Sequence, residues 1–186
     1  MSQNQNKTST KDITIIALFA AITFVSVQFL KIPTTPPDGF FHLGNVFVML
    51  GALLMGYKKG SVSAVIGLVL FDLINGYAQS IPKVIILTII KCIIVAGLFR
   101  VLREKMNEYV AVVLATVCSF IVGIAGDYIF YVVENMLAGS IFSVAAAVAV
   151  YATIPTVTNA VISMVIVPIL YPILRKILSE TNNKIY

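Results

Sequence analysis

Six long apolar runs divide this sequence, and they constrain its fold more than any other feature. A helix that crosses a membrane needs about 20 mostly apolar residues, and runs of that order recur along the chain with short polar or basic breaks between them. We predict spans at about 13–30, 42–57, 61–78, 82–102, 109–134 and 154–175, after a polar tail at 1–12. The chain is therefore expected to be an all-α integral membrane protein with six transmembrane helices in a single membrane domain, 1–186.

The composition supports this class and excludes others. Hydrophobic residues make up 59% of the chain and charged residues 11%, whereas a soluble domain carries about 45–50% and about 25%. So many apolar side chains could not all be hidden in one core of this size, which excludes a soluble enzyme, a disordered chain and a disulfide scaffold. The net charge of +5 comes from basic residues between the apolar runs. Membrane orientation explains them better than nucleic-acid binding does.

The distribution of basic residues predicts the orientation. Six crossings put both termini on one side, together with ten of the thirteen basic residues: Lys7, Lys11, Lys58, Lys59, Arg100, Arg103, Lys105, Arg175, Lys176 and Lys184. The positive-inside rule makes that side the cytoplasm. The Ala-rich stretch between Asn135 and Thr153 is interpreted as a short helix or a surface loop. If it crossed the membrane there would be seven spans. The basic residues at the C-terminus would then no longer lie on the same side as the other basic residues.

Polar side chains within the predicted spans gather in the outer halves. Charged groups inside a bilayer are costly and mark a site or a pathway, and aromatic residues interleave with them here, as in pockets that hold a flat ring. We predict a cup open to the outside, roofed by the Pro-rich loop at 33–41. The predicted binding residues are Lys91, Asp72, Asn75, Tyr77, Asp127, Tyr131, Glu134, Asn159, His42 and Asn45.

Two alternatives stay open for these residues. Asp72, Lys91 and Asp127 could neutralise one another as structural ion pairs. However, a lone lysine at depth shifts its pKa or finds an anionic partner, and for that reason it often has a function. For His42, the only histidine, a structural or lid role is favoured over direct contact with a substrate.

Several classes of chemistry lack a motif in this sequence. Cys92 and Cys118 lie far apart in apolar runs and are interpreted as small buried residues. A single histidine without nearby ligands makes no convincing metal site. No phosphate-binding loop or catalytic motif occurs, and the two halves show no clear inverted repeat. We therefore expect no enzyme activity, no metal and no cofactor.

The central part of the chain resembles a known family. The matching features are HLG at 42–44, G-x-x-x-G around the turn at 57–59, D-L-x-x-G-Y from Asp72 to Tyr77, and Lys91 in T-I-I-K. Further along, Y-x-x-E from Tyr131 to Glu134 and I-P at 154–155 match as well. These features resemble the substrate-binding S components of energy-coupling factor (ECF) vitamin transporters, in the riboflavin-type group that also includes pyrimidine and vitamin B6 carriers. Asn45 departs from the pattern, since many relatives are expected to have Asp there.

The resemblance implies a six-helix S component that captures a vitamin at the outer face of a bacterial plasma membrane. Its implied partners are a transmembrane scaffold subunit and two ABC-type ATPases, and the S component is thought to topple in the membrane to release its substrate inward. Ala17 and Ala21 are four residues apart, a spacing that allows another helix to approach closely. The spacing alone does not show whether that helix belongs to the same chain or to a partner. The resemblance implies that it belongs to the scaffold subunit.

The resemblance also implies that the loop at 33–41 gates the pocket, with Pro36, Asp38, Gly39, Phe40 and Phe41 as its gating residues. The vitamin stays open among hydroxymethylpyrimidine, a vitamin B6 vitamer and riboflavin, because specificity depends on geometry that the sequence does not contain. Two other functions remain as alternatives: a self-sufficient small-solute carrier, and a structural membrane subunit.

Overall fold

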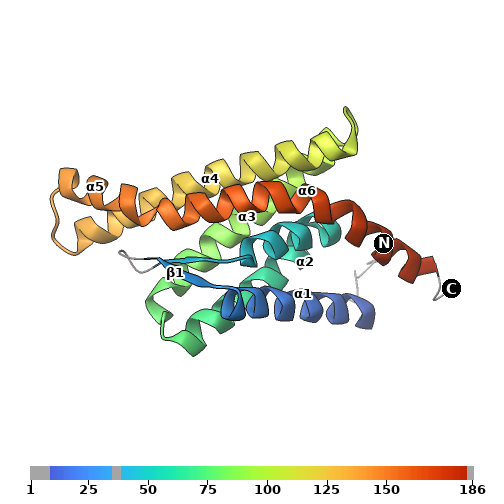
Figure 1. Cartoon of the computed structure of the whole chain (residues 1–186), viewed down its shortest axis with the longest axis horizontal. Helices are drawn as coiled ribbons and strands as arrows, with labels where there is room; N and C mark the ends of the chain where they lie inside the picture. The colour runs from blue at the N-terminus through green and yellow to red at the C-terminus, as the bar shows by residue number, and fades with distance from the viewer. Residues whose placement is uncertain (1–8, 35–38, 184–186) are drawn as a thin grey trace, which may run out of the picture.

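Long helices make up almost all of the computed structural model, which describes residues 9–34 and 39–183. The elements in chain order are α1 (Thr10–Phe29), β1 (Ile32–Thr34), β2 (Gly39–Phe41), α2 (Gly44–Asn75), the 3₁₀ helix η1 (Ala78–Ser80), α3 (Ile81–Leu102), α4 (Glu108–Leu137), α5 (Phe142–Ala152) and α6 (Ile154–Asn183). The helices run roughly along one long axis, and α1 begins and α6 ends at the same end of the molecule (Figure 1). The membrane class predicted from the apolar runs agrees with this architecture.

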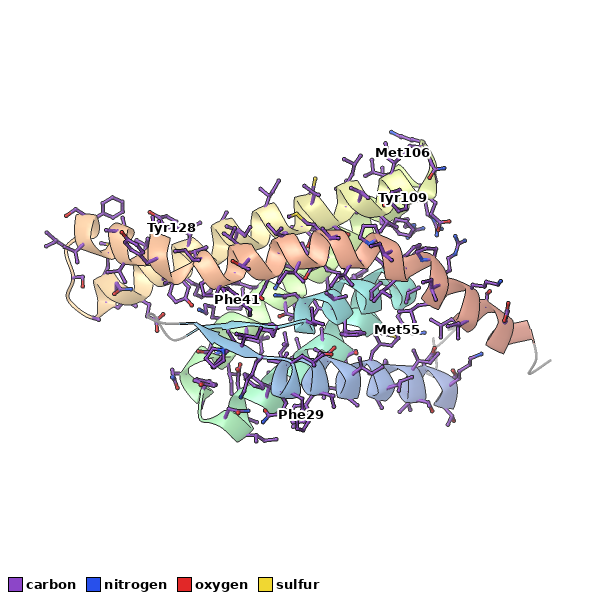
Figure 2. All side chains as sticks on the ribbon, viewed as in Figure 1. Phe29, Phe41, Met55, Met106, Tyr109 and Tyr128 are labelled. Carbon is purple, nitrogen blue, oxygen red and sulfur yellow. The ribbon has the colours of Figure 1, made fainter. Side chains whose placement is uncertain are left out.

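Five helical stretches of the described residues are long and apolar enough to cross a membrane, against the six that the sequence predicts. They are Thr10–Phe29, Gly44–Asn75, Ala78–Leu102, Glu108–Leu137 and Phe142–Glu180. Many large apolar side chains, Phe29 and Tyr109 among them, lie exposed along the outside of the bundle (Figure 2). A helix satisfies its own backbone hydrogen bonds, so such a surface suits hydrocarbon rather than water.

The difference in number lies in α2, which folds back on itself at Gly56. Gly56 has φ of 80° and ψ of 166°, a conformation that glycine adopts readily. A Cβ atom on Gly60 would lie 2.5 Å from the Cα of Ala52, a contact that a straight helix could not make between residues eight apart. The region predicted as two separate spans is therefore one helical stretch with two limbs, at 44–55 and 57–75.

Contacts with α1 show where the two limbs lead. Near the bend, Lys59 forms an ion pair with Asp12 at the start of α1, with 2.6 Å between Nζ and Oδ1. At the other end of α1, the Nδ2 of Asn75 donates to Gln28 over 2.7 Å. The first limb also begins at that end, because a Cβ on Gly44 would meet Val27. The bend thus lies beside the start of α1, and both ends of α2 lie beside the C-terminal end of α1.

We expect Gly60→Ala to lower the free energy of unfolding by about 1–3 kcal/mol, the usual cost of overpacking. The new methyl group would press on the backbone of Ala52, which cannot move aside as a flexible side chain could. Gly97→Ala in α3 is the matched control, because no atom of another described segment lies within 4 Å of its Cβ position. It should keep or slightly raise stability. Thermal unfolding in detergent measures both, and equal midpoints would contradict close packing of the two limbs.

The two short strands between α1 and α2 form a ladder. β1 pairs antiparallel with β2, Ile32 opposite Phe41 and Pro33 opposite Phe40. The Ala-rich stretch that the sequence left open between helix and loop is the helix α5, which packs on the end of α4 through Val132, Ala145 and Ala149. It leads into α6 with only Thr153 between them.

Candidate functional site

A cavity of about 220 Å³ lies between the β2–α2 segment and helices α2, α3, α4 and α6. Eight of the ten side chains predicted from the sequence line it: His42, Asn45, Asp72, Tyr77, Lys91, Asp127, Tyr131 and Asn159. They come from positions far apart in the sequence, so packing of the helices is what brings them together.

Lys91 enters this cavity from α3 without a carboxylate beside it. Its Nζ donates to Asn45 Oδ1 over 3.0 Å, and no carboxylate oxygen of residues 9–34 and 39–183 lies within 4.0 Å of it. Its aliphatic stem lies on Gly123, where a Cβ would come within 2.8 Å of the Lys91 Cδ. Ser119 holds the backbone at this point by donating to the Lys91 carbonyl over 2.9 Å. The ammonium group is thus held in place with donor capacity left over.

The ion pair of the cavity is made by a different lysine. Lys83 Nζ lies 3.3 Å from Asp127 Oδ1 and 3.7 Å from the ring centre of Tyr131, and Thr156 donates a hydrogen bond to the other oxygen of Asp127. Neither Lys83 nor Thr156 is among the binding residues predicted from the sequence. The available signal for Lys83 is its spacing of two helical turns from Lys91, which puts both lysines on one face of α3.

Asp72 supplies an acceptor that the described protein atoms leave unused. The side chain is only 7% exposed, and its Oδ2 atom is buried with no hydrogen-bond partner among the residues that the structure describes. Such an atom costs free energy unless a ligand or water donates to it. With Lys83 and Asp127 paired to each other, the cavity retains one cationic donor at Lys91 and one acceptor at Asp72.

Three aromatic rings form one wall of the cavity. Phe71 and Tyr77 are stacked, with 6.1 Å between ring centres and 21° between planes. Phe40 from β2 meets both rings at an angle, at 6.1 Å and 5.5 Å. Outside this group, Lys31 Nζ lies 4.9 Å from the Phe71 ring centre and donates to Asn75 Oδ1 over 3.0 Å. The wall gives a flat aromatic ligand a surface to stack on.

Asn159 and His42 line the cavity but already have partners in the backbone. Asn159 accepts from the His42 N–H and donates to the Phe40 carbonyl, each over 2.8 Å. His42 Nδ1 accepts from the Gly44 N–H over 3.1 Å, so the proton of a neutral ring is on Nε2. These contacts connect the β2–α2 segment to α6 and shape the cavity wall.

The remaining predicted residues lie elsewhere. Asn75 does not line the cavity and is bonded to Gln28 and Lys31, while Glu134 is exposed near the end of α4. Of the predicted gating residues, Gly39, Phe40 and Phe41 form β2, whereas Pro36 and Asp38 lie outside the described residues. Ala17 and Ala21 are both exposed on α1.

The lining of the cavity is suited to binding a ligand. It offers an ammonium donor, a carboxylate acceptor and an aromatic wall, a set that recognises a flat polar ring. No group of three or more His, Cys, Asp or Glu side chains in the described part of the chain is placed to hold a metal ion.

Comparison with known proteins gave one family. The family model described as "ECF-type riboflavin transporter, S component" matches residues 7–176. A search of curated proteins gave no match.

Proposed function

Since the chain belongs to the family of ECF-type riboflavin transporter S components, we propose that it captures riboflavin at the outer face of a bacterial plasma membrane for uptake. The observation that carries the proposal is the pairing pattern of the cavity. Lys91 has no carboxylate within 4.0 Å in the described part of the chain, and Asp72 Oδ2 has no hydrogen-bond partner among those residues. The isoalloxazine ring presents carbonyl oxygens for the first and an N–H for the second, and it can stack on the wall of Phe71 and Tyr77.

The size of the cavity favours a second candidate. Ligand pockets usually measure about 300–1,000 Å³, and this cavity is smaller, about 220 Å³. A single-ring vitamer, hydroxymethylpyrimidine or a form of vitamin B6, would fit without any movement of the walls. Riboflavin has three fused rings and a ribityl chain, and it would require the β2–α2 segment to move outward.

Chemical identification of the bound molecule decides between the two. The protein would be purified in detergent and denatured, and the released small molecules identified by mass spectrometry. Riboflavin near one equivalent supports the proposal, and a pyrimidine or B6 vitamer in that amount replaces it with the second candidate. For protein that emerges empty, titration with riboflavin follows through quenching of the flavin's own fluorescence, because the chain has no tryptophan. No binding of any of these vitamins would reject capture altogether.

The same proposal includes six crossings with both termini in the cytoplasm. It is supported by the reversal of α2 at Gly56 and by the basic residues Lys59, Arg103 and Arg175 near the end where α1 begins and α6 finishes. A protease site appended after α6 should be cut in inverted membrane vesicles and resist cleavage in intact cells. Cleavage in intact cells would reverse the orientation.

We further propose that the chain works with an ECF scaffold subunit and two ABC-type ATPases. Ala17 and Ala21 are exposed, whereas Ala20 is buried in the bundle, and its carbonyl oxygen would lie 2.6 Å from a Cβ on Gly67. The two exposed alanines thus leave a shallow strip free for a partner helix.

Phe40 and the backbone of β2 are proposed to cover the cavity from the outside.

A further inference from the structure

The side-chain amide of Asn159 is engaged at both ends by the backbone of another segment. Oδ1 accepts from the His42 N–H and Nδ2 donates to the Phe40 carbonyl, each over 2.8 Å. Asn159 lies in α6 and is only 3% exposed. Two hydrogen bonds from one planar group to backbone atoms two residues apart fix both the distance and the rotation of that segment relative to α6.

The segment held in this way carries three side chains that line the cavity. Phe40 contacts the rings of Phe71 and Tyr77, His42 lines the cavity beside it, and Asn45 accepts from Lys91 in the first turn of α2. The position of all three depends on where the backbone between Phe40 and Asn45 lies. Side chains that are already in the bound geometry bind more tightly, because less ordering is required on binding.

We propose that Asn159 is a positioning residue, which holds the Phe40–Asn45 wall in its binding geometry and does not itself contact the ligand. This inference rests on the proposed function, because it concerns the affinity of that cavity. It assigns Asn159 a different task from the direct ligand contact that the sequence suggests. Its effect on affinity arises through the backbone of Phe40 and His42.

Two substitutions separate the two hydrogen bonds. Asn159→Asp keeps an acceptor for the His42 N–H but loses the donor to the Phe40 carbonyl, whereas Asn159→Leu loses both. Riboflavin affinity should fall about tenfold for the first and about a hundredfold for the second, mostly through faster dissociation. Thr158→Ala is the matched control, since this neighbouring side chain is half-buried, lies outside the cavity lining and donates to the Ile154 carbonyl of its own helix. It should bind like the unsubstituted protein.

Hydrogen exchange in vitamin-free protein supplies a readout that a direct ligand contact would not change. The His42 amide should stay protected in Asn159→Asp and exchange about tenfold faster in Asn159→Leu, which lacks its acceptor. In Asn159→Leu, weakened riboflavin binding with unchanged exchange at His42 would overturn the inference in favour of direct contact. Faster exchange with unchanged affinity would overturn it as well, because the position of the wall would not matter. If Asn159→Leu fails to fold, Asn159→Asp still tests the inference, because unchanged riboflavin affinity in that variant would overturn it.

The outcomes also separate this inference from the proposed function. If the unsubstituted protein binds no riboflavin but binds a pyrimidine or B6 vitamer, the proposed substrate fails and the same variants are titrated with that vitamer. If it binds none of them, the proposed function and the role of Asn159 in affinity both fail, while exchange at His42 still reports whether Asn159 holds the backbone.

Discussion

Replacing Lys91 by methionine should weaken riboflavin binding about a hundredfold, which corresponds to the loss of one hydrogen bond from a charged donor, about 3 kcal/mol. Methionine keeps most of the aliphatic stem that packs on Gly123 and removes only the ammonium group. The folded protein should tolerate the change, because a partly buried lysine without a carboxylate partner contributes little net stability. The thermal midpoint is expected to shift by less than about 4 °C. Flavin fluorescence titration and thermal unfolding in detergent measure the two quantities.

Lys58→Met is the control for the loss of one positive charge. Lys58 is exposed beside the bend in α2, far from the cavity lining, so its replacement should leave the affinity unchanged. Equal affinities for Lys91→Met and the unsubstituted protein would remove Lys91 from the binding site. A loss shared by both variants would point to a general effect of net charge.

Leucine at Ala17 or Ala21 should abolish uptake while riboflavin binding stays within about twofold of normal. Both alanines are exposed on α1 and lie away from the cavity lining, so folding and binding do not depend on their size. A helix that docks on this strip approaches closely only over small side chains, and a leucine would hold it off. The measurement is accumulation of labelled riboflavin in cells that also produce a scaffold subunit and its ATPases, beside titration of the purified variants.

Ala147→Leu makes the same substitution at an exposed alanine of α5. It should leave uptake intact, because it lies on a different helix from the proposed docking strip. Uptake that survives leucine at both Ala17 and Ala21 would show that the docking surface lies elsewhere. Uptake that continues without scaffold and ATPases would instead favour a self-sufficient carrier.

Much of the candidate site follows from periodicity and depth. Asp72, Lys91 and Asp127 lie in different helices, yet a fixed rise per residue places each at a similar level once the apolar runs are aligned across a membrane. The structure puts all three around one cavity. Lys83 was not predicted as a site residue, because its partner Asp127 belongs to α4 and becomes its neighbour only through the packing of α3 on α4.

The sequence by itself determined the class of protein and the apolar stretches that become its long helices. These depend on local properties, the hydropathy and spacing of neighbouring residues. The tertiary structure alone decided which groups pair: Lys83 with Asp127, and Asn159 with the backbone of Phe40 and His42. It also decided that α2 turns back at Gly56. Pairing depends on how each helix is rotated about its axis and on which helices lie next to it. Both are set by the packing of the whole chain, so the sequence of a single segment does not predict them.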